Sequence, residues 1–170
     1  MPVDLQPTLA GDLVHLRPLR ADDFDALYAV ASDPLIWEQH PAHDRWKRDV
    51  FEAFFREAMA SGGALVALDA ASGAVIGSSR YHGYDAVTRD IEIGWTFLAR
   101  AYWGGAYNGE MKRLMLDYAF RFVDSVAFKI GPHNWRSRRA VEKIGGVFDR
   151  EATTPDGRSI VIYRLTAARR

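Results

Sequence analysis

The sequence predicts an α/β fold of the mixed α+β kind, in which a central, mostly antiparallel sheet is flanked by helices. Three observations indicate this class. Candidate strands outnumber candidate helices, and many of these strands follow one another directly along the chain. Hydrophobic residues make up 48% of the 170 residues, enough to bury a core. No internal repeat, low-complexity segment or second-domain boundary is visible, so we expect one domain over residues 1–170.

Hydrophobic spacing and turn residues place the elements of the first half. The stretch Leu13 to Leu19 alternates like a strand. Asp22 caps a short helix that reaches about Ser32. Residues 47–60 carry apolar side chains at helical spacing, and Gly62-Gly63 ends that helix. Two strands joined by a tight turn follow, Ala64 to Asp69 and Ala74 to Tyr81.

The stretch Thr88 to Leu98 is the clearest strand. Regular alternation predicts that its odd-numbered residues face one side of the sheet and its even-numbered residues the other. The first set is Ile91, Ile93, Trp95 and Phe97, and the second is Glu92, Gly94, Thr96 and Leu98. The remaining predicted elements are a helix from Ala106 to Asp124, a strand from Val126 to Ile130, a helix from Asn134 to Ile144, and closing strands over Val147–Glu151 and Ser159–Leu165.

Composition excludes several classes of protein. Lys+Arg and Asp+Glu are equal at 22 each, and this balance disfavours nucleic acid as a partner. The absence of cysteine excludes disulfides, a Cys-based zinc site and a thiol nucleophile. The first residues lack the pattern of a signal peptide, and no apolar run approaches the ~18 residues of a membrane span. We therefore expect a cytoplasmic protein with no membrane partner.

A glycine-containing turn leads from the clearest strand into the next helix. Small residues at Gly104, Gly105 and Ala106 let a ligand approach the main chain, and free amide groups at a helix start bind pyrophosphate. The alternative is a tight strand-to-helix turn without a ligand. Within the helix, Lys112 and Asn108 project from an otherwise apolar face, where polar groups need partners. Lys112 either contacts a ligand, extends past the helix end, or pairs with a carboxylate such as Glu92.

The second of these helices has two distinct faces. Asn134 lies at the cap position, and Ser137 lies on the inward face within the first turn, where its hydroxyl meets either a ligand or the backbone. A separate basic stripe consists of Arg136, Arg139 and Lys143. Cations near a helix start are unfavourably placed, which favours an anionic partner such as a terminal phosphate over a solvated face.

These segments resemble a known family. The run from Glu92 through the glycine turn to Glu110 resembles the acetyl-CoA-binding core of the GNAT N-acetyltransferases, and the run from Asn134 to Gly146 resembles the segment that follows it. The opening strand, Leu13 to Leu19, resembles that of the RimJ/RimL-like branch. The resemblance covers nearly the whole chain. It implies the GNAT fold and acetyl transfer from acetyl-CoA, as cosubstrate, to a primary amine, either a protein N-terminus or a small molecule.

The resemblance also implies where acetyl-CoA binds. Main-chain groups of Phe97, Leu98 and Ala99 are expected to bond the pantetheine arm, and Asn134 to contact it. The pyrophosphate is expected on the turn that contains Trp103, Gly104, Gly105, Ala106, Tyr107 and Asn108. Two positions depart from the family pattern. Ala101 stands where Gln or Arg is usual, with Arg100 one place early. Val141 stands where many members place a tyrosine as general acid, so this acid is either missing, replaced by Ser137 or supplied by solvent.

Without a cysteine, the expected mechanism is direct attack of the amine on the thioester. Glu92 is the candidate base, acting through water, and a main-chain N–H near Leu98 is the candidate oxyanion donor. Trp37, His40 and Tyr81 are the expected acceptor contacts. We expect no metal, because His40, His43 and Asp44 are weak evidence for one.

Two rival functions stand beside acetyl transfer. A CoA-binding sensor on a degenerate GNAT fold is the main alternative. A dinucleotide oxidoreductase is disfavoured because no Gly-x-Gly-x-x-Gly follows the first strand. The protein is expected to be a monomer or a homodimer.

Overall fold

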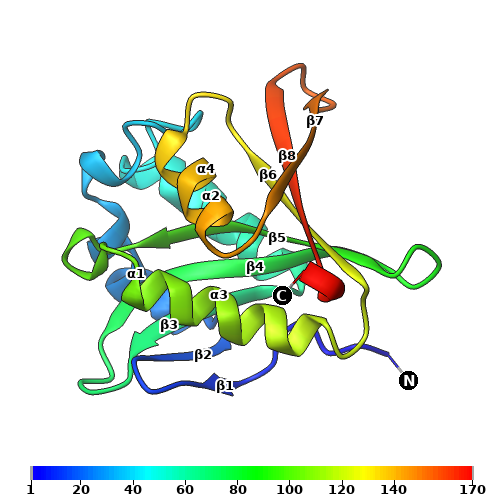
Figure 1. The fold of residues 1–170 in the computed structure, drawn as a ribbon. Coiled ribbons are helices and arrows are strands. Elements are labelled where there is room, and N and C mark those ends of the chain that lie inside the picture. The colour runs from blue at the N-terminus through cyan, green and yellow to red at the C-terminus, as the bar shows by residue number, and fades with distance from the viewer. Residues whose placement is uncertain (1, 170) are drawn as a thin grey trace.

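The computed structural model describes residues 2–169, which form an eight-stranded sheet flanked by helices (Figure 1). The strand order is β1-β2-β3-β4-β5-β6-β8-β7. Strands β5 and β6 are parallel, whereas the other neighbouring pairs are antiparallel. The predicted mixed, mostly antiparallel sheet is therefore confirmed. The strands are β1 (Leu9–Ala10), β2 (Val14–Pro18), β3 (Ala64–Asp69), β4 (Val75–Asp85), β5 (Asp90–Leu98), β6 (Ser125–Ile130), β7 (Val147–Thr153) and β8 (Ser159–Thr166).

Four α-helices cover the sheet in pairs. Helices α1 (Phe24–Ala31) and α2 (Arg48–Ser61) pack on one face, and α3 (Ala106–Ala119) and α4 (Trp135–Lys143) on the other (Figure 1). Short 3-10 helices cover Ala21–Asp23, Pro34–Ile36, Arg100–Tyr102 and Ala167–Arg169. Within residues 2–169, no helix has both the length and the apolar character needed to cross a membrane.

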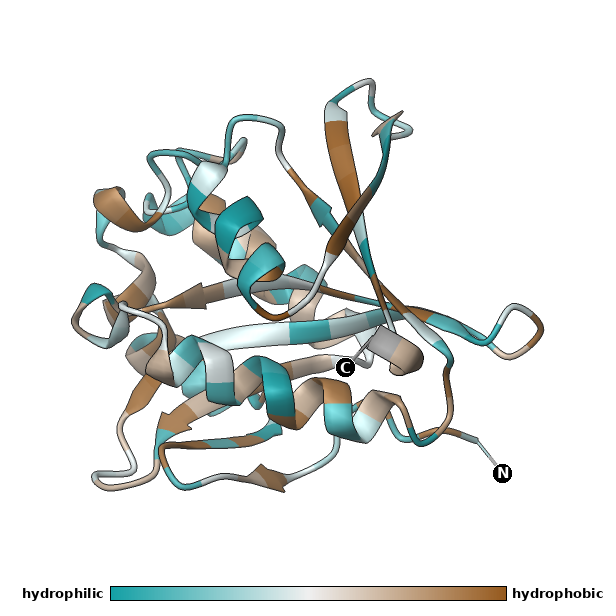
Figure 2. Ribbon diagram, viewed as in Figure 1, coloured by the Kyte–Doolittle hydropathy of each residue, from teal (hydrophilic) through white to brown (hydrophobic). Residues whose placement is uncertain are grey.

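The two faces of the sheet bury separate apolar cores. The core under α3 and α4 includes Met111, Met115 and Val141, whereas the core under α1 and α2 is rich in aromatic residues such as Phe51 and Phe54. Figure 2 shows hydrophobic residues along the central strands and a mostly hydrophilic α4. We call these two sides the α3 face and the α2 face of the sheet.

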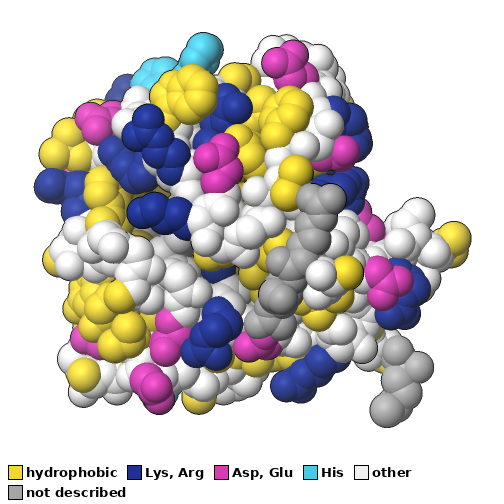
Figure 3. Space-filling view, in the orientation of Figure 1, with side chains coloured by type: hydrophobic (Ala, Val, Ile, Leu, Met, Phe, Trp, Pro, Cys, Tyr) yellow, Lys and Arg dark blue, Asp and Glu magenta, His cyan; other side chains and the backbone are white. Residues whose placement is uncertain are grey.

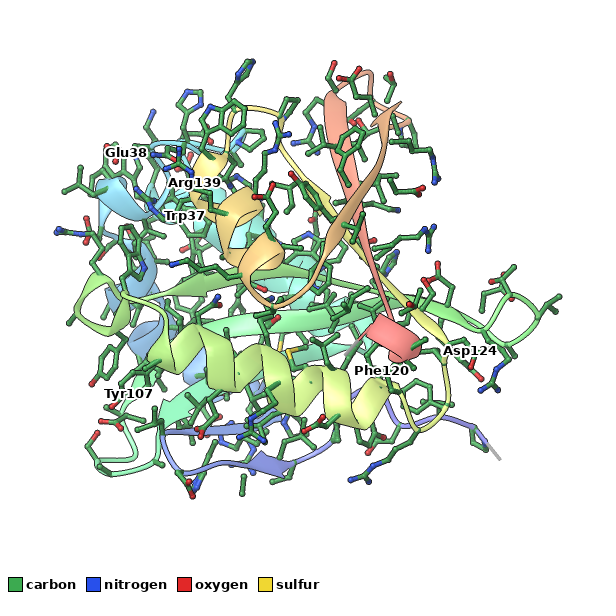
Figure 4. The ribbon with its side chains drawn as sticks, in the orientation of Figure 1. Trp37, Glu38, Tyr107, Phe120, Asp124 and Arg139 are labelled. Atoms are coloured by element: carbon green, nitrogen blue, oxygen red, sulfur yellow. The ribbon has the colours of Figure 1, made fainter. Side chains whose placement is uncertain are left out.

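The predicted helix to Asp124 ends early, at Ala119. The amides of Phe122 and Val123 both donate to the carbonyl of Ala119, so the chain tightens into a turn there. Val123 is buried in the α3-face core, and the amide of Asp124 donates to the carbonyl of Arg89. These contacts direct the chain into β6; Figure 4 labels Phe120 and Asp124 in this region.

Strand β1 was not predicted, and a side chain of α3 holds its connection to β2. The carboxylate of Glu110 accepts hydrogen bonds from the amides of Asp12, Leu13 and Val14, at 3.1, 2.6 and 2.7 Å. Glu110 lies near the start of α3, and its side chain is only 10% exposed. The start of α3 is therefore fixed against the N-terminal strands.

Candidate active site

The sheet splits between its two parallel strands. The ladder between β5 and β6 consists of the pairs Asp90–Ser125, Ile91–Val126 and Glu92–Ala127. Beyond Glu92, β5 continues along β4 while β6 continues along β8, and Figure 1 shows the two strands diverging. A split of this kind leaves one edge of β5 open to an extended ligand, which can add to the sheet as a strand does.

A β-bulge at Trp95 lies beside this split. The register between β4 and β5 shifts between Arg80–Gly94 and Ser78–Phe97, so β5 contains one residue more than β4 there. Trp95 adopts a positive φ of 53°, which is rare for a bulky residue. The extra residue reverses the alternation for the rest of the strand.

The bulge corrects the predicted faces of β5. Ile91 and Ile93 belong to the α3-face core together with Leu98, whereas Phe97 and Trp95 pack with the α2-face core. A regular strand would have placed Ile91, Ile93, Trp95 and Phe97 together. A Cβ on Gly94 would lie 3.2 Å from the Glu92 carboxylate, so these two positions share a face. Glu92 therefore lies on the same face as Phe97 rather than opposite to it.

Glu92 lies at a cavity on the α2 face. Its carboxylate is 3.4 Å from the ammonium group of Lys129 on β6, and its side chain is 11% exposed. This arrangement contradicts the alternative pairing of Glu92 with Lys112, which lies on the other face. The cavity has a volume of about 310 Å³ and is lined by His82, Gly83, Asp90, Glu92, Ala127, Lys129, Arg150, Ile162 and Arg164.

Lys112 extends from α3 towards the split. The residue is 5% exposed, and its Nζ donates to Oγ1 of Thr96, while the hydroxyls of Thr96 and Ser79 share a hydrogen bond of 2.8 Å. The same Nζ lies 5.6 Å from the centre of the Phe128 ring on β6. Burial without a carboxylate partner among the described residues lowers the pKa of Lys112 to about 7. Lys112 thus reaches both strands of the split with an amine that titrates near neutrality.

The turn before α3 has the geometry that its glycines predict. Gly104 and Gly105 have φ values of 113° and 108°, a conformation that side chains rarely adopt. The first helical hydrogen bond runs from the Gly109 amide to the Gly105 carbonyl. The amides of Ala106 and its two successors, Tyr107 and Asn108, therefore lie in the first turn at the positive end of the helix dipole.

Trp103 contacts the end of β5, the strand that borders the split. Its indole Nε1 donates to the carbonyl of Leu98 at 3.0 Å, and the amide of Ala99 donates to the carbonyl of Ile76. Two main-chain groups expected to bind pantetheine thus have partners within the chain. The guanidinium of Arg136 lies 4.0 Å from the centre of a Trp103 ring.

The three residues of the predicted basic stripe on α4 differ in their surroundings. Arg136 forms an ion pair of 3.3 Å with Glu38, whereas Arg139 and Lys143 are exposed. Figure 3 shows Lys and Arg side chains gathered over this helix, and Figure 4 shows Arg139 on the same side as Trp37 and Glu38. Two of the three cations are thus free to meet an anion at the surface.

The first turn of α4 is capped from within. Oδ1 of Asn134, a buried residue, accepts a hydrogen bond of 3.3 Å from the amide of Ser137. Val141, at the position of the family's tyrosine, is buried against Gly146. Ser137 is half-buried. Because valine has no ionisable group, position 141 provides no proton donor.

The residues expected to contact the acceptor lie on opposite faces of the sheet. Trp37 is buried on the α2 face, and the His40 ring packs against it at 5.6 Å. Burial, with the nearby charges of Arg45 and Arg158, lowers the pKa of His40 to about 3. Tyr81 lies on the α3 face instead, where it is fully buried and donates to the carbonyl of Met115. The structure therefore separates Tyr81 from the other two.

Sequence reasoning missed four polar residues near this site. Thr96 bonds Lys112, Lys129 faces Glu92, and Arg45 and Arg80 lie among aromatic rings of the α2 face. A polar run, Ser78-Ser79-Arg80, interrupts an apolar strand and was a signal available in the sequence. The other three positions depend on the bulge and on pairings between distant segments.

Solved structures of several acetyltransferases share this fold. A GCN5-related N-acetyltransferase from Brucella melitensis superposes with a TM-score of 0.81 at 23% identity, covering 96% of this chain and 80% of that one. A probable GNAT-family acetyltransferase from Chromobacterium violaceum gives 0.84 at 21% identity, covering 96% and 88%. A putative ribosomal-protein-serine acetyltransferase from Vibrio cholerae gives 0.77 at 12% identity, covering 96% and 99%. The fold is that of the GNAT N-acetyltransferases.

The sequence comparison identifies the family. A family model described as acetyltransferase (GNAT) domain matches residues 14–147. The chain belongs to this family. An uncharacterized Bacillus subtilis protein, YkkB, is 46% identical over 57 residues, which cover 32% of this chain and 33% of that protein. The match thus spans about a third of the curated relative's length.

Proposed function

We propose that the protein transfers an acetyl group from acetyl-CoA to a primary amine by direct attack in a ternary complex. The split between β5 and β6 is the observation that carries this proposal. It offers an extended ligand an open strand edge, with the glycine turn of α3 on one side of the sheet and Glu92 on the other. The acetyl donor and the amine therefore reach the reaction centre from opposite faces.

Acetyl-CoA would lie along β5, with its pyrophosphate on the first turn of α3. The residues there fit a diphosphate. The space beside Gly104 and Gly105 is open, because a Cβ on either would meet no atom within 4 Å, and their positive φ values require glycine. The exposed Arg139 and Lys143 would hold a terminal phosphate. Asn134 would orient the pantetheine arm, and Lys112 would contact the thioester end. Trp103 would release the Leu98 carbonyl when the arm binds.

Glu92 would act as the general base through a water molecule. It lines the cavity on the α2 face, where the amine enters, and Lys129 orients its carboxylate. A main-chain N–H of the bulge would stabilise the oxyanion. This places the donor at Trp95 rather than near Leu98, because the structure bends at Trp95.

The leaving thiolate needs a proton that Val141 is unable to give. Ser137 is the first candidate, and Lys112 is the second, because its amine titrates near neutrality and lies at the split. Comparison of Ser137→Ala with Lys112→Met separates them. The variant that lacks the proton donor should lose kcat by about 10²-fold or more while retaining CoA binding.

The experiment that tests the function is acetyl-CoA turnover with a panel of N-terminal peptides and small amines. Thiol release that requires an amine supports the proposal. CoA binding without turnover of any amine would favour the alternative, a CoA-binding sensor on a degenerate GNAT fold, which the missing tyrosine at Val141 supports.

Three finer assignments are also proposals. The first strand supports a RimJ/RimL-like branch, to which the Vibrio cholerae protein's name adds a ribosomal acceptor as one case to include in the panel. The absence of cysteine supports the cytoplasm. We propose a monomer or homodimer, which sedimentation would distinguish.

A further inference from the structure

Among residues 2–169, one arginine buried on the α2 face has two nitrogen atoms without a hydrogen-bond partner. Arg80 on β4 is 5% exposed, and its Nε and Nη2 atoms are fully buried without a hydrogen-bond partner among residues 2–169. Its guanidinium lies 4.3 Å from the centre of a Trp95 ring and 5.6 Å from that of Phe54. A buried charge of this kind is costly unless something compensates it, and aromatic stacking compensates only part.

A second arginine shares the same aromatic cluster. The guanidinium of Arg45 lies 4.5 Å from the centre of Phe54 and 5.1 Å from that of Trp37. Burial and the charges of Arg80 and Arg158 lower the pKa of Arg45 to about 10. The acidic groups that act electrostatically on the two arginines are Glu57, Asp44 and Glu92, and none forms an ion pair with either arginine in the described part of the chain. Neither guanidinium thus has a carboxylate in contact with it among these residues.

This cluster adjoins the proposed base. Arg80 pairs with Gly94 and His82 with Glu92 across the ladder, so all four share the α2 face. The His82 ring also packs on Trp95 at 5.4 Å. Two residues along a strand span about 7 Å, so a short molecule can reach from Arg80 to Glu92.

We propose that the acetyl acceptor is a small amine that also carries a carboxylate or phosphate, and that Arg80, with Arg45 beside it, binds this anionic group. The inference rests on the proposed function and names its substrate class. Nε and Nη2 lie on one edge of the guanidinium, and that edge matches two oxygens of a carboxylate or phosphate. An anion bound there satisfies both atoms and pairs with the Arg80 charge, while the amine is directed towards Glu92.

The test compares matched amines. Leucine is assayed against leucinamide, and 2-aminoethyl phosphate against ethanolamine, with rates expressed per unprotonated amine. We expect kcat/KM to favour the anionic member of at least one pair by about 30-fold or more, because truncating a buried charge contact typically costs that much. The pair that shows the preference distinguishes carboxylate from phosphate.

Variants of Arg80 test whether this residue causes the preference for the anionic amine. Arg80→Met should reduce the ratio within the preferred pair to near one, and Arg80→Lys, which keeps the charge without the two-pronged edge, should reduce it in part. Arg48→Met is the matched control, since Arg48 stacks on Phe24 and Tyr28 but pairs with Glu52 at the surface. It should leave the ratio unchanged.

A second readout does not depend on turnover. The preferred anionic amine should raise the melting temperature of the wild type and of Arg48→Met, but not of Arg80→Met. Equal or better use of the neutral amines overturns the inference and leaves acetyl transfer standing. A preference that survives in Arg80→Met overturns the assignment of Arg80 as the residue that binds the anionic group. Absence of turnover with every amine overturns the inference and the proposed function together.

Discussion

The amine of Lys112 on α3 donates a hydrogen bond of 2.5 Å to the hydroxyl of Thr96 on β5. This contact joins the helix that begins at the glycine turn to the strand that borders the split. It lies just past the bulge at Trp95, where β5 leaves the regular alternation. Within residues 2–169, the Lys112 ammonium contacts a hydroxyl and an aromatic ring but no carboxylate, which is unusual for a buried cation. This arrangement makes the stability of the fold depend on pH.

Lys112 should make the stability of the fold depend on pH above neutrality. Its pKa is lowered to about 7 in the fold, against 10.5 ordinarily, so the unfolded chain binds the extra proton between these values. The free energy of unfolding should therefore rise as the pH increases from 7 towards 10.5. Lys112→Met should remove this rise and stabilise the protein by a few kcal/mol at pH 7.

Urea unfolding at pH 7 and pH 10 measures the effect, with Lys47→Met, an exposed lysine, as the control. The gain from Lys112→Met should shrink at the higher pH, and the control should show no such difference. An equal effect of Lys112→Met at both values would contradict the lowered pKa of Lys112.

The sequence was sufficient to predict the α-helices and strands from β2 onwards and their order, because hydrophobic periodicity and glycine positions determine both. It was insufficient at the bulge. Alternation assumes regular pairing, and nothing in the sequence marks Trp95 for a positive φ. The prediction therefore placed Glu92 on the wrong face relative to Phe97, although both residues were identified.

Two further site residues depended on tertiary packing. Tyr81 is among the expected acceptor contacts, but its position on β4 directs it under α3. Its neighbour Arg80 faces the opposite side, among aromatic rings that come from α2 and β5. Local patterns give no information about which helix will cover which face.

Glu92→Gln should separate catalysis from binding. The variant keeps the size of the side chain but is unable to take a proton, so kcat should fall by about 10²- to 10⁴-fold while CoA affinity is unchanged. Steady-state thiol release measures kcat and calorimetry measures CoA affinity, and an unchanged kcat would exclude Glu92 as the base.

His40 should contribute to loss of stability in acid. Its pKa is lowered to about 3 in the fold, against 6.5 ordinarily, so only the unfolded chain is protonated at this residue between these values. Stability should therefore fall as the pH decreases from 6.5 towards 3. Protonation would also break the hydrogen bond that Nδ1 accepts from the Ala42 amide.

His40→Gln should reduce this acid sensitivity, measured as the change in melting temperature between pH 7 and pH 4.5. The exposed His43 provides the control, since His43→Gln changes a histidine just beyond the turn that the His40–Ala42 hydrogen bond closes. If both variants alter the acid response equally, burial of His40 is not the cause.

Trp103→Phe should tighten CoA binding. The indole of Trp103 occupies the Leu98 carbonyl, and this is the group that a pantetheine amide needs at the end of β5. Phenylalanine keeps an aromatic ring for Arg136 to stack on but has no N–H, so the ligand no longer competes with it. Since one hydrogen bond contributes about 0.5–1.5 kcal/mol net, the dissociation constant of CoA should fall by about 2- to 10-fold. Calorimetry measures the change, with the half-exposed Trp135→Phe as the control. Weaker binding by Trp103→Phe would instead show that the indole contacts the ligand directly.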